Sequence, residues 1–439
     1  MVRATRTPST LAGEPLSMPA SLWSDTAIPG PRLGALAGRL ETDVVIVGAG
    51  FTGLSAAIHL AEAGMRCVVL DASQPGWGAS GRNNGQVIAG LKQDPDVVEM
   101  LLPGRSGQRL VQFASEASSK VFELIARHRI DCAANNAGWI QPAFTRSGIA
   151  AVLHRSRAWQ ERGITVRILE GKTLFERLGT QKYSIGWLDP RGGSVQPLSY
   201  VRGLAHAALV VGVKLFERTH VRSIAGTLGR FEVTTDGGIA ACKQVIVATG
   251  AYAERLVPNL ARSFVAVRTA QIATRPLPHA MRAVILPFAN VASDTRQLLT
   301  SFRLSPDGRL VMGGSGATTG LDHSSIVPHL YRAGAELFGS LGKLEWQYAW
   351  SGLFAVTADH LPHMHEPQPG IHVAVGCNGR GIAVSTSLGI ELARRVAGAS
   401  REELAVPVSD IRTIPFHAFR TLGVAAATRY KRLQDRLER

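Results

Sequence analysis

Cysteine is scarce in this chain of 439 residues, and two further features are missing with it. The four cysteines form no Cys-x-x-Cys pair, and a reduced, cytoplasmic setting is the simplest interpretation of their spacing. No apolar run is long enough to span a membrane. The first ten residues are basic but no apolar stretch follows them, which argues against a secretory signal.

Acidic residues are also few, 33 against 48 lysines and arginines, which gives a formal net charge of +15. Such an excess can indicate nucleic acid or an anionic membrane surface as a partner. The basic residues are spread along the chain, however, and no basic block alternates with aromatics, so we expect no nucleic-acid partner. A small basic cluster at the C-terminus is interpreted as a solvated helix face; it comprises Arg429, Lys431, Arg432, Arg436 and Arg439.

One strong motif is present, an apolar run over 44–47 followed by Gly48, Gly50 and Gly53. In a strand-turn-helix context these glycines allow a tight turn, a close approach of the backbone to a pyrophosphate, and close packing of helix on strand. The helix start then offers free N–H groups to phosphates. A second apolar run ends at Asp71, where a ribose hydroxyl would be held and a 2′-phosphate disfavoured. The motif predicts an adenine dinucleotide without deciding between NAD and FAD.

Composition and pattern predict two interleaved domains. With 45% hydrophobic and 18% charged residues, the chain is typical of a globular protein with a substantial core. The expected division is an N-terminal arm (1–40), a discontinuous dinucleotide-binding domain (41–95, 150–260 and 350–400), a substrate domain (96–149 and 261–349) and a basic helical tail (401–439). Helices are expected near 107–128, 198–211, 328–341 and 382–397, and the strands of an antiparallel sheet at 264–274, 284–286, 298–302 and 310–312.

Three more features decide the cofactor type. A loop rich in glycine and asparagine covers 78–86, an apolar strand ends at Gly250, and a glycine-rich turn over 376–381 leads into a long helix. An NAD dehydrogenase has no obvious need for this last turn. A flavin does, because its pyrimidine edge gains negative charge on reduction and a helix N-terminus stabilises that charge. The combination favours FAD.

At these positions the chain resembles the D-amino acid oxidase-like (DAO) family of FAD-dependent amine oxidoreductases, and within it the gamma-glutamylputrescine oxidoreductase-like branch. The loop over 78–86, the start Ser21-Leu22-Trp23 and the run from Trp350 to Pro362 carry the resemblance. It implies an α/β fold: a Rossmann-like FAD-binding domain of glutathione-reductase-like topology, with an inserted α+β substrate domain built on an antiparallel sheet.

The resemblance also implies which residues contact FAD. The three glycines would hold the pyrophosphate, Asp71 the adenosine ribose, and the backbone of Val221 the adenine, while the turn before the late helix would meet the isoalloxazine ring. The expected set is Gly48, Gly50, Phe51, Thr52, Gly53, Asp71, Ala72, Gly78, Ala79, Ser80, Arg82, Asn83, Asn84, Gly85, Gln86, Val221, Ala248, Thr249, Gly250, Gly379, Arg380, Gly381 and Ile382.

Departures from the family pattern refine this expectation. Arg380 replaces a histidine and would favour a reduced anionic flavin or an anionic substrate group, which makes it the candidate for catalysis by electrostatic tuning. No cysteine lies over 352–356, where sarcosine-oxidase-like relatives attach FAD, so non-covalent FAD is expected. Those relatives hold a substrate carboxylate with a lysine where Ala383 and Val384 stand here. Their oxygen-activating lysine has no counterpart over 310–312, so oxygen and quinone both stay open as electron acceptors.

The expected reaction is FAD-dependent oxidation of a C–N bond in a small amine or amino acid, with hydride transfer to flavin N5 and hydrolysis of the imine. Alternatives are a dehydrogenase that reduces a quinone, and, because of the basic charge, a flavoprotein subunit or RNA-associated partner. No metal is expected at His360, His363 and His365, since no further ligand spacing completes a site. Cys377 is either redox-active or, as we prefer, a small packed residue.

Overall fold

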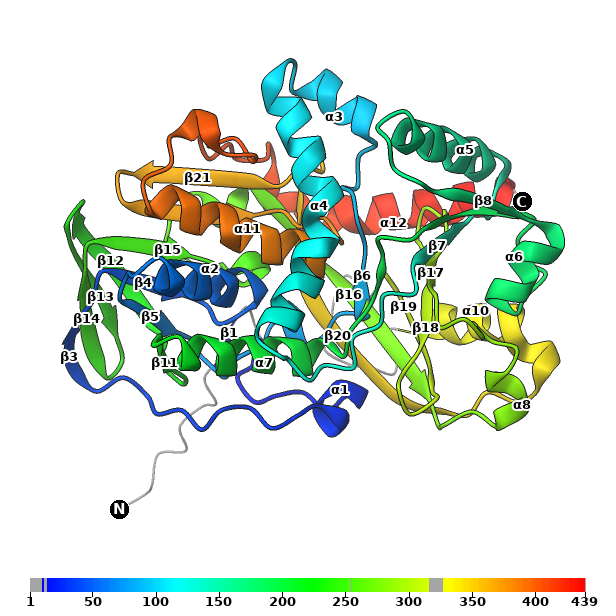
Figure 1. Ribbon diagram of the computed structural model, residues 1–439, viewed down its shortest axis with the longest axis horizontal. Helices are drawn as coiled ribbons and strands as arrows, with labels where there is room; N and C mark the ends of the chain where they lie inside the picture. The colour runs from blue at the N-terminus through cyan, green and yellow to red at the C-terminus, as the bar shows by residue number, and fades with distance from the viewer. Residues whose placement is uncertain (1–9, 12–13, 254, 316–326, 439) are drawn as a thin grey trace.

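The computed structural model describes residues 10–11, 14–253, 255–315 and 327–438 (Figure 1). The parts of the predicted arm, domains and basic cluster that fall on 1–9, 12–13, 254, 316–326 and Arg439 lie outside these residues. Two large sheets organise the fold. No helix of the described ranges is long and apolar enough to cross a membrane.

The first large sheet has six strands and contains the motif strand β4 at its centre. Its pairs are parallel except for the edge strand β21, which is antiparallel to β22. A parallel sheet covered on both faces requires continuous apolar strands, and every residue of β4 and β5 is buried. The order is β11 (Lys214–Phe216), β5 (Cys67–Leu70), β4 (Val44–Val47), β15 (Gln244–Val247), β22 (Ile371–Val375) and β21 (His363–Gln368).

Alternation along β4 divides the core into two layers. Val44 and Ile46 pack in a cluster with helical side chains, whereas Val45 and Val47 pack with the residues of a small four-stranded sheet, as the period of two in a strand requires. The helices are α2 (Phe51–Glu62), α4 (Arg105–Arg127), α7 (Pro197–Val210) and α11 (Gly381–Val396), and the small sheet is β12 (Val221–Thr227), β13 (Arg230–Thr235), β14 (Gly238–Cys242) and β3 (Gly38–Glu41).

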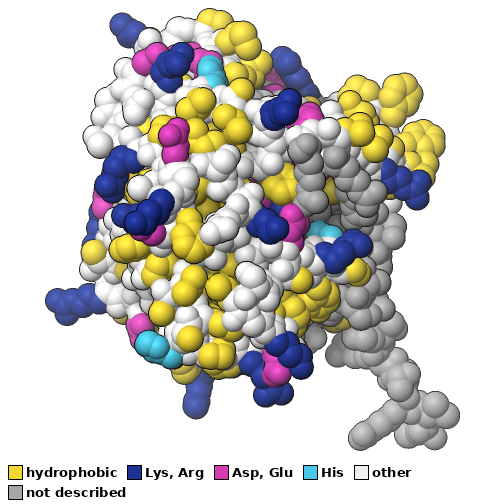
Figure 2. Space-filling view, turned by 90° about the vertical axis from the view of Figure 1, so that its right-hand side faces the viewer, with side chains coloured by type: hydrophobic (Ala, Val, Ile, Leu, Met, Phe, Trp, Pro, Cys, Tyr) yellow, Lys and Arg dark blue, Asp and Glu magenta, His cyan; other side chains and the backbone are white. Residues whose placement is uncertain are grey.

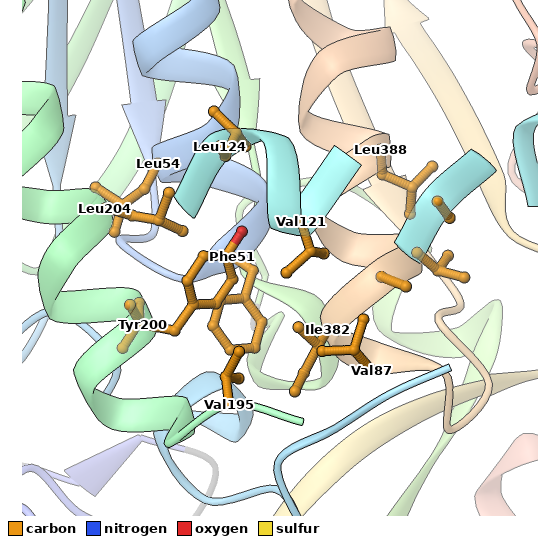
Figure 3. Close-up of a cluster of buried hydrophobic side chains, with 14 of the residues drawn as sticks. Phe51, Leu54, Val87, Val121, Leu124, Val195, Tyr200, Leu204, Ile382 and Leu388 are labelled. Atoms are coloured by element: carbon orange, nitrogen blue, oxygen red, sulfur yellow. The ribbon is translucent and has the colours of Figure 1, made fainter. Parts of the chain in front are cut away.

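Figure 3 shows side chains of the four helices meeting in one buried cluster. Phe51 at the start of α2 packs on Tyr200 of α7, with ring centroids 5.2 Å apart. Val121 of α4 and Ile382 of α11 join the same buried cluster. The cluster therefore fixes the N-termini of α2 and α11, which are the two helix starts expected to face the cofactor.

The second large sheet has eight strands and is antiparallel except for the pair β17 and β7. A separate hydrophobic cluster joins the sheet to α6 (Gly171–Leu178), α8 (His279–Arg282) and α10 (Pro328–Phe338). The order is β20 (Trp346–Thr357), β16 (Phe264–Thr274), β19 (Leu310–Ser315), β18 (Ser301–Leu304), β17 (Val291–Ser293), β7 (Trp139–Pro142), β9 (Ile185–Asp189) and β8 (Arg167–Glu170).

Two details differ from the sequence-based expectation. Strands β8 and β9 pair in the eight-stranded sheet, although 150–260 was assigned to the dinucleotide domain, and 284–286 forms a turn after α8 instead of a strand, with Leu286 at φ 49°. Short apolar runs do not reveal which sheet they join, because that choice rests on distant partners. We propose that about 139–189 belongs with the substrate domain.

The remaining elements connect these layers, and α12 at the C-terminal end lies behind the larger sheet in Figure 1. They are β1 (Thr10–Leu11), β2 (Glu14–Pro15), α1 (Leu22–Thr26), β6 (Gln86–Val87), α3 (Pro95–Leu101), α5 (Arg146–Gln160), β10 (Gly193–Ser194) and α12 (Arg420–Leu437).

Candidate cofactor and active site

The glycine turn has the geometry that the motif predicts. Gly48 has φ +107°, and a Cβ there would lie 2.8 Å from the carbonyl oxygen of Ala248. A Cβ at Gly53 would lie 1.9 Å from the carbonyl oxygen of Gly48, so α2 touches the turn with no room for a side chain. Gly50 caps α2 without a side-chain hydrogen bond, and the helix start can offer N–H groups to an anion.

Asp71 closes the turn at the end of β5. Its carboxylate accepts hydrogen bonds from the amides of Ala49 (2.7 Å) and Ser73 (2.8 Å). Burial raises the pKa of Asp71, and the two amide hydrogen bonds oppose this rise. A carboxylate accepts about four hydrogen bonds, so acceptor positions are left for a ribose hydroxyl.

A cavity extends from this turn along the ends of β4, β5, β15 and β22 to the turn at Gly376 and Cys377 and to Ser385 and Leu388 of α11. Thirteen of the predicted cofactor residues line it: Gly48, Gly50, Phe51, Thr52, Asp71, Ala72, Gly78, Ala79, Ser80, Val221, Ala248, Thr249 and Gly250. Their convergence supports the predicted dinucleotide path, and their contacts with the cofactor remain a prediction.

The other ten predicted residues do not line this cavity: Gly53, Arg82, Asn83, Asn84, Gly85, Gln86, Gly379, Arg380, Gly381 and Ile382. Arg82 departs furthest from its expected role beside the diphosphate. Its guanidinium forms a buried ion pair with Glu14 of the N-terminal arm and donates to the carbonyl of Trp77 at 2.6 Å. Arg268 approaches the other oxygen of Glu14 at 2.8 Å.

The rest of the 78–86 loop is tied to the substrate sheet. Asn84 donates to the side-chain oxygen of Gln271 at 3.0 Å, and Gln86 donates to the carbonyl of Ala292 at 2.8 Å. The loop therefore begins in the cavity and ends against the second large sheet, which links the two sheets at one point.

Several cavity residues were not predicted as contacts. They include Tyr252, Leu353 to Ala355, Gly376 and Cys377. Two of these groups lie in segments that the family resemblance already singled out, the run after Trp350 and the turn before α11. Burial raises the pKa of the Cys377 thiol, which disfavours the nucleophilic thiolate and agrees with a packed residue.

Beside the start of α11 lies a group of cations from separate elements. The Arg380 guanidinium stacks over the Trp139 ring at 4.8 Å and donates to the carbonyl of Ala89 at 3.2 Å. Burial, with repulsion from Arg155, lowers the pKa of Arg380 to about 9. Arg155 itself pairs with Asp94.

Lys92 is the second important cation of this group. Its side chain is open to solvent, yet burial and the charges of Arg380, Arg155 and Lys431 lower its pKa to about 8. Among the described residues Lys92 forms no hydrogen bond or ion pair, and the carboxylate of Asp94 lies close enough for its charge to oppose the fall in the pKa of Lys92.

The histidine cluster forms no metal centre in the described residues. His363 pairs with Asp359 at 3.0 Å, and the ring of His365 hydrogen-bonds to the carbonyl of Ser409 at 2.8 Å. These partners account for two of the three rings as structural groups.

Comparison with known proteins decides the family. The model of the FAD-dependent oxidoreductase family DAO matches residues 43–395. The chain belongs to this family. It is therefore an FAD-dependent oxidoreductase, and its predicted fold class is confirmed.

Individual relatives agree with this assignment. The chain is 30% identical to gamma-glutamylputrescine oxidoreductase of Escherichia coli (strain K12) over 407 residues, which cover 91% of this chain and 94% of the relative. It is 27% identical to glycine oxidase of Geobacillus kaustophilus (strain HTA426), covering 87% and 97%. The crystal structure of L-amino acid deaminase from Proteus myxofaciens in complex with anthranilate shares the fold, with a TM-score of 0.72 at 18% identity, covering 85% and 94%.

The cavity residues fit FAD. The open helix start of α2, the acceptor Asp71 and the glycine contacts that leave no space for a Cβ suit a diphosphate and a ribose. At its other end the cavity is lined by Gly376 and Cys377 of the turn before α11 and by Ser385 and Leu388 of the helix itself, and the nearby helix N-terminus would stabilise negative charge.

Proposed function

We propose that this enzyme oxidises a C–N bond in an amine or amino acid that carries an anionic group, with FAD bound non-covalently. Bound FAD would supply hydride acceptance at N5. The observation that carries the substrate class is the pair Lys92 and Arg380, two cations beside the start of α11 that form no ion pair with a carboxylate among the described residues.

The residues have separate tasks in this proposal. The backbone around Gly48 and Gly50 and the carboxylate of Asp71 hold the adenosine diphosphate end. Arg380, stacked on Trp139, has a fixed orientation and would bind the anionic group of the substrate or stabilise negative charge near the flavin. Lys92 adds a second cation in reach of solvent. Hydrolysis of the released imine needs no residue of the site.

The electron acceptor is proposed to be a quinone or a similar carrier in preference to oxygen. Leu310, Val311 and Met312, the stretch where a lysine would activate oxygen in some relatives, are fully buried apolar side chains. The four cysteines are free, which supports the proposed reduced, cytoplasmic compartment. An RNA-associated role gains no support, since on the face in Figure 2 basic side chains are scattered among acidic and apolar ones.

Anaerobic bleaching of the purified flavoprotein tests the proposal. Amines with a carboxylate should bleach the flavin band near about 450 nm, whereas the matching amines without one should react at least tenfold more slowly. Air should then restore the band slowly and a soluble quinone quickly. Failure of every amine and amino acid to bleach the flavin would contradict the proposed chemistry, and equal rates for both classes would contradict the anionic substrate. Fast reoxidation by air would refute the proposed acceptor.

A further inference from the structure

The C-terminal segment exposes an unusual amount of apolar surface. Of the fourteen large hydrophobic side chains that are exposed in the described residues, six lie between 416 and 437. They are between 53% and 83% exposed: Phe416, Phe419, Leu422, Tyr430, Leu433 and Leu437. A segment of 22 residues thus holds nearly half of these side chains.

The exposed residues of α12 share one face of the helix. Leu422, Tyr430, Leu433 and Leu437 follow the spacing i, i+8, i+11 and i+15, which keeps side chains on one stripe of a helix. We call this stripe, with Phe416 and Phe419, the outer stripe. In Figure 2, hydrophobic and basic side chains project together at the upper right edge of the molecule, the side on which α12 lies.

Polar contacts hold α12 with this stripe outward. The carboxylate of Asp435 accepts hydrogen bonds from the amides of Gln297 (2.8 Å) and Leu298 (3.3 Å). Before the helix, His417 is bonded to the carbonyl of Phe264 at 2.9 Å. Lys431 is close enough for its charge to lower the pKa of Lys92. The helix therefore leaves its large apolar side chains in solvent while Asp435 and Lys431 face the protein, whereas an ordinary surface helix buries its large apolar residues.

The charge of the C-terminal segment indicates which partner binds the outer stripe. Residues 416–439 contain six arginines and lysines against two acidic residues, and Arg420 and Arg429 are exposed. A second copy of this chain, itself at +15, would bring like charges together. An anionic bilayer surface suits both the exposed apolar stripe and the excess of basic residues. The apolar side chains enter the headgroup boundary, while the basic ones meet lipid phosphates.

We propose that α12, with Phe416 and Phe419, is an interfacial helix that binds the enzyme to the surface of an anionic membrane. The helix lies on the surface and does not cross it, with the outer stripe in the headgroup boundary and Arg420 and Arg429 at the phosphates. The proposal gives the C-terminal basic residues lipid phosphates as partners, where the sequence analysis interprets them as a solvated helix face. It does not depend on the proposed substrate.

Vesicle sedimentation with the full-length, FAD-loaded enzyme tests this proposal. Vesicles of phosphatidylcholine with about 30% phosphatidylglycerol should bind the enzyme, whereas pure phosphatidylcholine should bind it weakly. The variant L422S/L433S/L437S should partition at least about tenfold less, and R429Q about fivefold less. The matched control is M100S/V210S, which alters two exposed apolar side chains elsewhere and should bind like the parent enzyme.

Flavin content and thermal melting verify that each variant is folded. Two results together support the proposal: binding to the anionic vesicles weakens as the salt concentration is raised, and L422S/L433S/L437S (the stripe variant) binds less than the control M100S/V210S. Equal binding to both vesicle types, or equal binding of stripe and control variants, overturns it. The proposal is also overturned if the parent enzyme is a dimer that does not bind vesicles and the stripe variant is a monomer. That result would assign the stripe to contact with a second copy of the chain.

Discussion

The two ends of the site are built in different ways. The adenosine end uses backbone from one continuous stretch, 48–71, in which glycines remove side chains so that amides and a helix start can reach the ligand. The substrate end uses side chains from separate elements, Lys92, Arg155 and Arg380, whose charges perturb one another. The first end suits dinucleotides in general, and in the proposed function the second end selects the substrate.

Gly53 gives the largest expected effect and tests the adenosine end. In G53A the new Cβ would meet the carbonyl oxygen of Gly48 at 1.9 Å, and backbone would have to move, at a cost of about 3 kcal/mol or more in stability. We expect little FAD in the purified variant, measured by the ratio of flavin to protein absorbance. G34A is the control, because no atom lies within 4 Å of its Cβ. Normal FAD content in G53A would contradict the geometry of the turn.

Glu14 joins the 78–86 loop to the larger sheet, since it is buried and pairs with both Arg82 of the loop and Arg268 of β16. E14Q leaves two guanidinium groups without their carboxylate, and loss of a buried partner costs about 3–5 kcal/mol. Denaturant unfolding should show the loss as a lower midpoint. The control E232Q breaks an exposed pair with Arg39 and should change stability by less than about 1 kcal/mol. Similar midpoints for the two variants would show that the buried pair has no special role.

Arg380 tests the substrate end. R380L should keep its FAD but lose about a hundredfold in kcat/KM for a carboxylate-bearing substrate, as expected for a desolvated charge partner. R380K restores the charge without the planar fork and should recover part of the loss. An equal loss for substrates with and without a carboxylate would assign Arg380 to the flavin instead of the substrate.

Lys92 gives the smallest and most specific effect, a dependence on pH. Its pKa of about 8 means that the ammonium is charged at pH 7 and loses its proton as the pH rises to 9. KM for the carboxylate-bearing substrate should therefore rise by about tenfold over this interval, relative to the uncharged analogue. K92M should show the high KM already at pH 7 and no further change. A parallel pH profile in K92M would exclude Lys92 from substrate binding.

The difference between local contacts and contacts of distant segments also explains which parts of the fold and the site could be predicted from the sequence. The turn, Asp71, α2 and α11 follow from local glycine and apolar patterns, and the structure places them as expected. The membership of β8 and β9 in the larger sheet, the pairing of Arg82 with Glu14 and the place of Lys92 depend on contacts between distant segments. No local pattern encodes these contacts, and the outward face of α12 was hidden for the same reason.

The buried arm has a consequence for how the chain matures on the ribosome. Glu14 can form its ion pair with Arg268 only after residue 268 has been synthesised. Trp23 packs on Trp350 with ring centroids 5.6 Å apart, and its indole N–H donates to the carbonyl of Asn83. Glu14 and Trp23, near the start of the chain, thus find these partners only after most of the polypeptide has been synthesised. Contacts over such separations form slowly, so closure of the arm would be a late event, and bulky additions ahead of it would delay a finished, cofactor-binding enzyme.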